Sequence, residues 1–472
     1  MSIRELLAQA IAVFDVGVIL YFITLNSLYL TFTAIAFFEL RRRRRRWTPR
    51  EISGVMQSPA TPPISIVLGA YNEQLSVVAS VRSLLALNYP AFEVVVVNDG
   101  SSDGTLAALQ GAYGLVEAPL SHAQAISTGR VRGVYRSPTT PDIVVIDKVN
   151  GGSKADAINA GLNAARHPLV CVIDADSLLE NDALVRVVLP FIEDARTVAV
   201  GGIMRVANGC VIEGGRVTEV RLPRNWLARF QVVEYLRAFL AGRVAQSTLN
   251  GLLIISGGFG VFRREVLLGA GGFEAGSIGE DMEIVTRIHR HCLEERRPYR
   301  IVFLPDPVCW TEVPETTRGL ALQRNRWHRG TLDVLTRHSA MIGNPKYGRV
   351  GLFATPYYMV FEAFGPVVEG LGYVVTIAAA CFGLINWPIA RLLFIAALSY
   401  GVLVSVGAVL LEDVFFRRYR RLGDLLRLLL FGVVENFGYR QLTMWWRIQG
   451  WVDFLRNKSG WTPTPRKGFA RA

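Results

Sequence analysis

Acidic side chains follow an apolar segment of this sequence in a pattern that suits metal-assisted chemistry. Asp174 and Asp176 come directly after residues 169–173, and alternate residues at the end of a strand project to the same side. Two carboxylates so placed repel each other unless a cation lies between them. The pair therefore favours a hard divalent ion with few protein ligands, whose coordination is completed by phosphate oxygens of a substrate.

Two more side chains, Asp99 and Lys154, are candidates for contact with a phosphorylated substrate, and a further acid, Asp281, begins a predicted helix. Asp99 lies in a turn after another apolar run, as either a turn residue or a ligand-binding group. Lys154 follows the glycine-bearing segment 150–153, where backbone amides, a helix N-terminus and the lysine ammonium together suit a phosphate. The alternative is an exposed lysine in a loop. The segment lacks the residue spacing of a P-loop. Asp281 opens a predicted helix over 281–292, and its position alone favours an N-cap or first-turn acid.

Alternating strands and helices are predicted to position these residues. Short runs rich in Val and Ile predict buried strands, and an Ala-rich stretch between two of them predicts a helix. Such alternation is typical of a doubly wound, mostly parallel α/β sheet, in which ligands bind at the carboxyl ends of the strands. The predicted strands are 64–68, 93–97, 143–146 and 169–173, the helices are 154–165 and 225–244, and a hairpin is expected within 204–221.

The composition places part of the chain in a membrane. Hydrophobic residues make up 51% of the 472 residues and charged residues 19%, which excludes a disordered chain. A mean hydropathy of +0.30 favours a membrane protein with a sizeable soluble part. The five cysteines are scattered and form no CxxC pair, which excludes a disulfide framework and a thiolate zinc site and favours a reducing compartment.

The N-terminal region predicts an uncleaved membrane anchor. Residues 16–38 carry no charged side chain, and a bilayer needs about 20 helical residues. Six consecutive arginines, 41–46, follow this run and mark the cytoplasmic side, so the N-terminus is expected outside. We interpret the arginines as a topology signal in contact with lipid headgroups, and we expect no nucleic-acid partner despite the net charge of +12.

Two further spans are predicted near the C-terminus. Residues 370–390 and 392–411 lack charges, and Asn-Trp-Pro at 386–388 is expected to form the turn between them. The preceding stretch, 350–368, holds two prolines and a glutamate and predicts an interfacial or broken helix. Residues 425–446 are expected in the membrane with their topology left open.

Within that last stretch, Glu435 and Arg440 are candidates for a channel lining, because ionisable groups at membrane depth usually face a protein interior or a polar pathway. The expected organisation is an anchor with its arginine run (1–46), a linker (47–63), a cytoplasmic catalytic domain (64–340) and an interfacial and transmembrane region with a basic tail (341–472).

Taken in order, the motifs resemble those of the family 2 glycosyltransferases, in the membrane-integrated branch that contains cellulose, hyaluronan and poly-N-acetylglucosamine synthases. The resemblance covers residues 70–327, a little over half of the chain, and ends in the QxxRW pattern. The motifs are AYNE at 70–73, NDGS at 98–101, KADA at 154–157, DAD at 174–176, SGG at 256–258, GED at 279–281 and QRNRW at 323–327.

The resemblance implies a GT-A type fold and inverting transfer of a sugar from a nucleotide donor, usually linked to UDP. It implies that Asp281 is the catalytic base with Glu280 beside it, and that Asp176 is the ligand of Mg²⁺ or Mn²⁺. Nucleotide-sugar contacts are implied for Tyr71, Glu73, Asp99, Lys154, Asp174, Gln323 and Arg326, and acceptor contacts for Trp327 and Gly257.

The chemistry of these residue types agrees with that implication. A departing nucleoside diphosphate carries charge that a divalent ion and cations such as Lys154 and Arg326 can spread. A sugar hydroxyl is a poor nucleophile and needs a carboxylate to accept its proton. Trp327 offers an apolar ring face to a sugar, although membrane anchoring or core packing would also suit it. Arg324 and Arg329 beside it are expected to be solvated or to face lipid headgroups.

Two departures from the family pattern bear on the expected function. Gly279 stands where many members have Thr, and one span precedes the catalytic domain where several polymer synthases have two. A partner subunit or a homo-oligomer would then complete an export channel. The first hypothesis is a processive polysaccharide synthase of the inner or plasma membrane. The alternatives are transfer of one sugar to a lipid or lipid-linked acceptor, and a non-catalytic nucleotide-sugar-binding membrane subunit.

Overall fold

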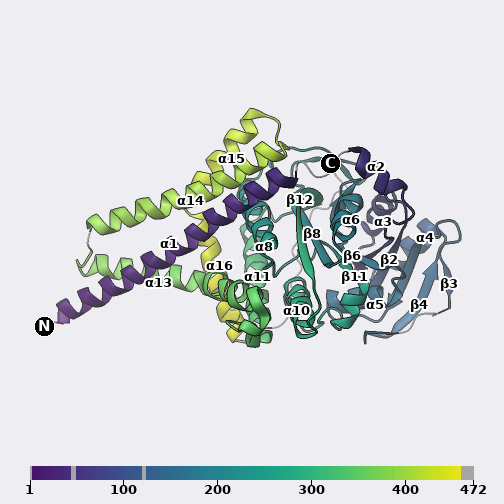
Figure 1. Ribbon diagram of the computed structural model, residues 1–472, viewed down its shortest axis with the longest axis horizontal. Helices are drawn as coiled ribbons and strands as arrows, with labels where there is room; N and C mark the ends of the chain where they lie inside the picture. Colours follow the sequence, from purple (N-terminus) through teal and green to yellow (C-terminus); the bar gives the residue numbers. More distant parts are fainter. Residues whose placement is uncertain (1–2, 44–48, 120–123, 386, 459–472) are drawn as a thin grey trace.

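A ten-stranded sheet forms the centre of the described part of the chain (Figure 1). A computed structural model describes residues 3–43, 49–119, 124–385 and 387–458. The central strands are apolar runs with almost every side chain buried, because helices cover the sheet. In sheet order the strands are β3 (Val116–Ala118), β4 (Val131–Arg136), β5 (Ile143–Lys148), β2 (Phe92–Asp99), β1 (Ile64–Ala70), β6 (Leu169–Asp174), β11 (Phe259–Arg263), β8 (Thr197–Val206), β12 (Arg300–Thr311) and β7 (Ser177–Leu179).

The sheet is mostly parallel, as the alternation of strands and helices predicted. β5, β2, β1 and β6 are parallel neighbours, and β11 lies antiparallel between β6 and β8. The register brings the carboxyl ends of the parallel strands level: Gly69 pairs with Asp174, and Asp99 pairs with Lys148. Polar residues from four separate motifs therefore meet at one edge of the sheet.

Each of the four predicted strands is present and runs one or two residues further at its carboxyl end. The additional residues are polar or small, and their backbone groups continue the ladder although the apolar pattern has ended. An apolar pattern follows the burial of side chains, whereas strand pairing depends on the backbone. The candidate site residues Asp99 and Asp174 thus end strands and are held by the sheet itself.

Helices pack on the sheet, with α5 against β1 and β2 and α6 against β8 and β12. Ser153 caps α5 by accepting a hydrogen bond from the Asp156 amide (3.3 Å), which fixes where this Ala-rich helix begins. The helices of this part are α3 (Val77–Leu85), α4 (Thr105–Tyr113), α5 (Lys154–Ala164), α6 (Ala183–Glu193), α9 (Arg264–Gly269), α10 (Glu280–Glu294) and α11 (Thr317–Arg337).

The helix predicted over 225–244 is present in three parts, and it packs against the apolar helices described below. It comprises α7 (Trp226–Tyr235), a π-helical turn η1 (Leu236–Arg243) and α8 (Val244–Thr248). The π-helical turn is typical of functional sites, because it redirects side chains within a continuous helix. The expected hairpin before it is formed by β9 (Val211–Glu213) and β10 (Arg216–Glu219).

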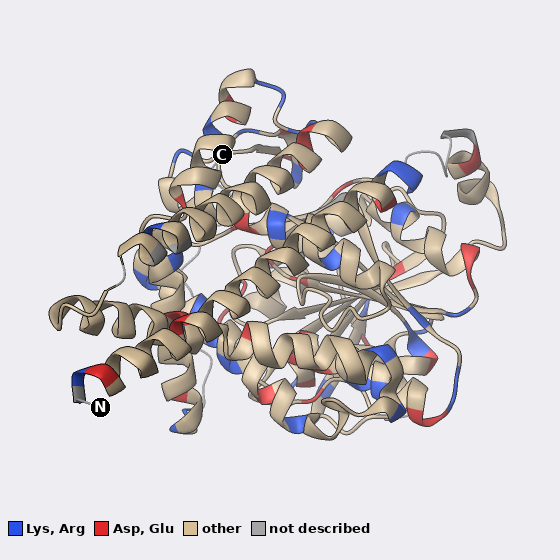
Figure 2. Ribbon diagram, turned by 60° about the vertical axis from the view of Figure 1, so that its left-hand side comes forward, with Lys and Arg blue, Asp and Glu red and all other residues tan. Residues whose placement is uncertain are grey.

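Three described helical stretches are long and apolar enough to cross a membrane: Arg4–Arg43, Val350–Cys381 and Ala390–Phe415. They belong to α1 (Ile3–Arg43), to a helical run that ends in α13 (Gly365–Cys381), and to α14 (Trp387–Phe415). Figure 1 shows α1, α13 and α14 extending together away from the sheet, and Figure 2 shows few charged residues along them. The prediction of apolar helices at both ends of the chain is confirmed.

The boundaries within the C-terminal region differ from the prediction. α13 ends at Cys381 and α14 begins at Trp387, so the turn precedes the expected Asn-Trp-Pro, whose first residue lies outside the described part. Pro388 lies in the first turn of α14, where its missing N–H leaves no intrahelical bond unmade. Gly383 (φ +63°) supports the tight connection instead.

The stretch before α13 is a distorted helix that continues into it, which agrees with a broken helix. It consists of η4 (Val350–Ala354), α12 (Thr355–Tyr357) and η5 (Tyr358–Ala363), and the η elements are π-helical. Between α11 and this run lie two short 3-10 turns, η2 (Ser339–Met341) and η3 (Pro345–Tyr347).

Residues 425–446 fall into two helices, α15 (Leu422–Val434) and α16 (Tyr439–Leu455), and neither is among the candidate spans of the described residues. Glu435, in the break between them, is completely buried; it forms ion pairs with Arg237 of η1 and with Arg440, and accepts a hydrogen bond from Ser405 (2.5 Å). This network neutralises Glu435 and Arg440 within the protein and joins α14 to η1.

Part of the expected linker is helical. α2 (Pro49–Gln57) packs Ile52, Val55 and Met56 against the main hydrophobic core. Residues 44–46 of the arginine run and most of the basic tail, from 459 onward, lie outside the described residues. All five cysteines are free, as the scattered spacing predicted.

Candidate active site

Lys154, the first residue of α5, lies beside the end of β6 and the start of α10. Its ammonium forms ion pairs with Asp174 at the end of β6 and, at 3.7 Å, with Glu280 at the start of α10. It also donates a hydrogen bond of 2.8 Å to the carbonyl oxygen of Gly257. Lys154 is therefore in direct contact with residues of three other sequence motifs, those that contain Asp174, Gly257 and Glu280.

Asp281 enters the same cluster from the first turn of α10. The amide of Gly257 donates to its Oδ2 at 3.1 Å, and the amide of Met282 donates to its Oδ1 at 2.8 Å. The N-cap position is Gly279, so Asp281 is not an N-cap, but it does lie among the acids of the first turn of α10. Gly257 joins the two halves of the site, because its carbonyl binds Lys154 and its amide binds Asp281.

The charges of this cluster shift the pKa values of two members. Burial by itself lowers the pKa of Lys154, but the charges of Asp174, Glu280 and Asp281 outweigh burial and raise that pKa. Burial raises the pKa of Glu280; Lys154 opposes this shift, whereas Asp281 and Asp174 add to it. Lys154 is therefore a permanent cation, and Glu280 takes up a proton more readily than an exposed glutamate.

Asp176 lies in the turn between β6 and β7, two residues after Asp174, and both are partly exposed. No group of three or more His, Cys, Asp or Glu side chains within the described residues has the arrangement of a metal site. Two partly exposed carboxylates are oxygen donors that fit Mg²⁺ or Mn²⁺ when the remaining ligands are water and diphosphate oxygens. The residues present thus fit a divalent ion shared with a substrate.

Asp99 is held by Lys148, a buried lysine that belongs to none of the sequence motifs. Its Oδ1 accepts from the Lys148 ammonium (2.5 Å) and from the amide of Gly151 (3.2 Å). Lys148 also pairs with Asp156 and is completely buried. The sequence does contain a signal for this contact, because Lys148 ends an apolar strand. A lysine in that position stays buried only when carboxylates pair with it. Asp99 thereby anchors the glycine-bearing loop before α5, and its predicted contact with a base stays a prediction.

Tyr71 and Glu73 lie in the loop after β1, which is bound to the loop after β2. Asn72 between them has φ +56°, a left-handed conformation that Asn tolerates, and its amide donates to the Ser101 hydroxyl (3.0 Å). Tyr71 is 50% exposed, whereas the Glu73 carboxylate accepts a hydrogen bond from Ser76. Both residues lie at the carboxyl edge of the sheet, and their contacts with a nucleoside stay a prediction.

The QxxRW residues lie on α11 next to the start of α10. Gln323, Arg326 and Trp327 share a helix face with Gly330, because residues three, four and seven apart are neighbours on a helix. Gly330 packs directly on Gly279, where an added Cβ would lie 3.1 Å from the Gly330 Cα. A threonine at residue 279 would place its Cβ at the same distance, so α10 and α11 would have to move apart by a few tenths of an ångström.

The neighbours of Trp327 are buried, so the expectation that Arg324 and Arg329 are solvated or face headgroups is wrong. Arg324 is 3% exposed and pairs with Glu234. Arg329 is 7% exposed and donates to the carbonyl of Lys458 (2.7 Å). α16 covers this side of α11, and a local pattern of charges does not reveal that a later helix packs there.

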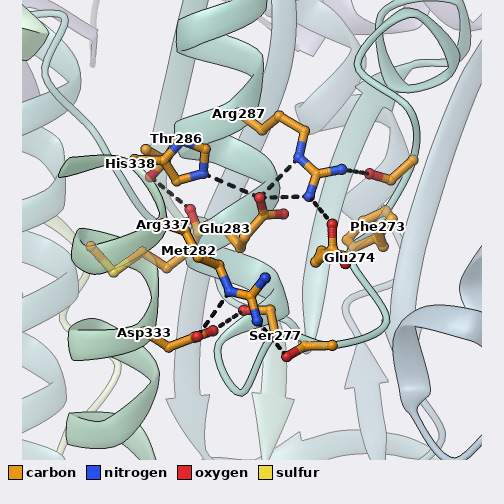
Figure 3. Close-up of polar contacts among 12 residues, drawn as sticks. Phe273, Glu274, Ser277, Met282, Glu283, Thr286, Arg287, Asp333, Arg337 and His338 are labelled. Atoms are coloured by element: carbon orange, nitrogen blue, oxygen red, sulfur yellow. Dashed lines mark hydrogen bonds and ion pairs between the residues drawn. The ribbon is translucent and has the colours of Figure 1, made fainter. Parts of the chain in front are cut away.

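A second polar network holds the loop in front of α10 (Figure 3). Arg287 of α10 pairs with Glu274 in the loop and with Glu283, both at 2.7 Å. Asp333 of α11 accepts from the Ser277 hydroxyl at 2.8 Å. The loop is thus tied to both helices, which fixes the position from which Glu280 and Asp281 enter the site.

Arg243 of η1 is a further basic residue, and it belongs to none of the sequence motifs. Its guanidinium carbon lies 4.0 Å from the ring centroid of Phe239, and its Nη1 is buried with no hydrogen-bond partner among the described residues. Burial lowers the pKa of Arg243, and the charge of Asp281 partly offsets that shift.

Residues 62–330 match the family described as "Glycosyltransferase like family 2". The chain belongs to the family 2 glycosyltransferases. Poly-beta-1,6-N-acetyl-D-glucosamine synthase of Staphylococcus aureus is 30% identical over 276 residues, 58% of this chain and 56% of that protein. The synthase of the same name from Staphylococcus epidermidis is 30% identical over 275 residues, with the same shares. The chain thus spans about half the length of these curated relatives.

Among solved structures, the mannosyltransferase PcManGT from Pyrobaculum calidifontis, in complex with GDP-Man and Mn²⁺, has a TM-score of 0.55 to this chain. It is 20% identical and covers 94% of this chain and 100% of its own. The likeness confirms the GT-A type fold. The resemblance, the fold class and the class of enzyme, a glycosyltransferase related to polysaccharide synthases, are all confirmed.

Proposed function

We propose that this glycosyltransferase transfers sugars from a UDP-linked donor to a growing polysaccharide at the cytoplasmic face of a membrane, inverts the anomeric carbon, and exports the chain as it grows. The proposal depends on the convergence of Lys154, Asp174, Glu280 and Asp281 around Gly257. The names of the matched relatives make UDP-N-acetylglucosamine the first donor to test. The basic last turn of α1 supports a cytoplasmic catalytic domain.

The donor would lie at the carboxyl edge of the sheet with its diphosphate beside Lys154. Departure of a nucleoside diphosphate requires its developing charge to be spread, and the ammonium of Lys154 is held charged by its carboxylate neighbours. Mg²⁺ or Mn²⁺ held by Asp174 and Asp176 would supply Lewis-acid stabilisation of the same diphosphate. The nucleoside contacts fall to Tyr71, Glu73 and Asp99.

The acceptor hydroxyl would lose its proton to Asp281. Two amide N–H groups hold this carboxylate, so its orientation is set before the acceptor arrives. A hydroxyl is a poor nucleophile until a base within hydrogen-bond reach accepts its proton. One-step attack from the face opposite the diphosphate would convert an α-linked donor into a β-linked product. Glu280 lies next to Asp281 in the sequence, and its carboxylate is 3.7 Å from the positively charged ammonium of Lys154.

The acceptor would approach along the face of α11 that meets α10. Trp327 is 42% exposed there, and its indole offers an apolar surface on which a sugar ring can stack. Gln323 and Arg326 on the same face are proposed to contact the diphosphate. Gly257 keeps the space between base and donor open, because an added Cβ would lie 3.2 Å from the Lys154 ammonium.

Substitution of Asp281 by Asn tests the proposal. Release of UDP or GDP would be measured with UDP-N-acetylglucosamine, UDP-glucose, UDP-glucuronate and GDP-mannose, each with Mg²⁺ or Mn²⁺. Asn retains an oxygen for one of the two amide N–H groups but cannot accept a proton, so we expect turnover to fall by about 10²–10⁴-fold while UDP binding is unchanged. The control is Glu295→Gln, which removes a carboxylate at the opposite end of α10.

Four outcomes would contradict parts of the proposal. Equal turnover of Asp281→Asn and wild type would remove the catalytic role of this residue. Products carrying a single added sugar would refute processive synthesis, and a labelled product that extracts into organic solvent would instead assign a lipid-linked acceptor. Wild-type protein that binds UDP but turns over none of the four donors would favour the non-catalytic binding subunit.

A further inference from the structure

Trp327 rests on a buried arginine. The guanidinium carbon of Arg324 lies 4.3 Å from the centroid of the Trp327 ring, a distance typical of a cation–π contact. Arg324 is 3% exposed, whereas Trp327 is 42% exposed. The guanidinium thus supports the indole from the protein interior while a large part of the ring remains accessible.

A carboxylate and a tyrosine from two other elements hold this arginine in place. Oε2 of Glu234, on α7, accepts a hydrogen bond of 2.7 Å from Nη2 of Arg324 and another of 2.7 Å from the hydroxyl of Tyr439. Tyr439 is the first residue of α16, and its ring stacks on Phe230 with centroids 4.6 Å apart. Nε of Arg324 has no hydrogen-bond partner in the described part of the chain. Nη1 of Arg324 donates a long hydrogen bond of 3.4 Å to Oε1 of the adjacent Gln323, so the position of Arg324 depends chiefly on Glu234 and on the indole.

We propose that Glu234 and Tyr439 are positioning residues that orient the indole of Trp327 through Arg324, and that they thereby set how tightly the acceptor is held. The inference rests on the acceptor role of Trp327 in the proposed function. A buried guanidinium is stable only when its charge is paired. Without the carboxylate, Arg324 would move towards water and the indole would lose the surface that fixes its orientation.

The arrangement also connects the acceptor end of the site to the C-terminal helices. α7, α11 and α16 come from parts of the chain that are distant in sequence, and Glu234 is hydrogen-bonded to both of the other helices. A shift of α16 relative to α11 would break the bond from Tyr439 and change the environment of Trp327. Lys154 lies on a different element and has no part in this chain of contacts, whereas Gln323 on α11, proposed above to contact the diphosphate, accepts a hydrogen bond of 3.4 Å from Nη1 of Arg324.

The test compares Glu234→Gln, Tyr439→Phe and Trp327→Ala in the full-length enzyme, with UDP-N-acetylglucosamine as donor and a β-1,6-linked N-acetylglucosamine pentamer as primer. Loss of an ordered cation–π contact should raise the KM for the primer roughly five- to tenfold, with the KM for the donor and UDP binding unchanged. In the Trp327→Ala background, Glu234→Gln should add no further change, because both substitutions remove the same interaction.

Two further variants separate positioning from general stability. Glu412→Gln breaks the buried ion pair with Arg205 that joins α14 to β8, and it should lower Tm without changing the KM for the primer. Arg324→Lys keeps a charge for Glu234 but lacks the planar group that stacks on the indole, so it should reproduce the rise in KM. Arg324→Lys also decides the question if Glu234→Gln does not fold.

The outcomes separate this inference from the proposed function. If Trp327→Ala leaves the KM for the primer unchanged, the proposed acceptor role of Trp327 fails and the inference fails with it. If Trp327→Ala raises this KM but Glu234→Gln and Arg324→Lys do not, the inference alone is wrong. It is equally wrong if Glu234→Gln multiplies the effect of Trp327→Ala, or if Glu412→Gln raises the KM for the primer as much as Glu234→Gln does.

Discussion

Replacement of Gly279 by alanine should disturb catalysis although residue 279 has no predicted contact with substrate. A Cβ at this position would lie 3.1–3.2 Å from three backbone atoms of Gly330, on α11. Ordinary contacts of a Cβ begin near 3.4 Å, so α10 and α11 would have to separate by about 0.3 Å. Neither side can yield by rotating a side chain, because both partners are backbone.

The magnitude follows from this displacement. Overpacking of a close contact costs about 1–3 kcal/mol, offset by about 0.4–1 kcal/mol from the reduced freedom of the unfolded chain when Gly becomes Ala. The net loss of about 1–2 kcal/mol should lower Tm by roughly 2–4 °C. A misplacement of 1 Å can cost about 10²-fold in rate, so a shift of Asp281 by about 0.3 Å should cost roughly fourfold.

The assay pairs thermal unfolding with steady-state release of UDP. Gly276→Ala is the matched control: it lies in the same loop, and its added Cβ would meet the side chains of Arg337 and Glu274 at ordinary distances of 3.7 and 3.8 Å. Gly330→Ala should reproduce the effect from the other side of the contact. If Gly279→Ala and Gly276→Ala had the same Tm and turnover, the argument from close helix packing would be refuted.

Two further predictions concern the metal and pH. Asp176→Asn should raise the Mn²⁺ concentration for half-maximal activity about 10–100-fold, whereas Asp281→Asn should leave that concentration unchanged. If Asp176→Asn and the wild type depended equally on Mn²⁺, the assignment of Asp176 as a metal ligand would be contradicted. Burial lowers the pKa of His289 to about 4, whereas a histidine in the unfolded chain has a pKa of ~6.5. The contribution of neutral His289 to the free energy of unfolding is therefore fully present above pH ~6.5 and is lost as the pH falls towards about 4. The loss amounts to about 2 kcal/mol at pH 5. His289→Gln should flatten the dependence of Tm on pH between 4 and 6.5, and an unchanged slope would contradict this prediction.

The elements that position the site were largely predictable, because their signals are local. β1, β2, β5 and β6 are short apolar runs bounded by turn residues, and a buried strand needs little more than such a run. The same holds for α5, whose Ala-rich sequence follows a Ser N-cap, and for the long apolar helices. Boundaries were less accurate where polar residues continue a strand or proline begins a helix, as at Asp99 and Pro388.

The burial of charged side chains was not predictable. Arg324 and Arg329 have the local pattern of a solvated helix face, yet α16, more than a hundred residues later, covers them. Lys148 is buried because Asp99 and Asp156, from two other elements, surround its ammonium. Local spacing does not record which distant carboxylate will neutralise a given cation, and the free energy of burying a charge depends on that partner.

By itself, the order of residues determined the strands, the apolar helices and which side chains stand at the strand ends, since each follows from hydrophobic pattern and turn chemistry within a few residues. The tertiary structure alone decided that Gly257 would join Lys154 to Asp281, that Gly330 would press on Gly279, and that Glu234 would reach Arg324. These contacts join residues from 24 to 103 positions apart. They exist only once the sheet and helices have packed, because packing, and no local preference, brings those backbones within a few ångströms.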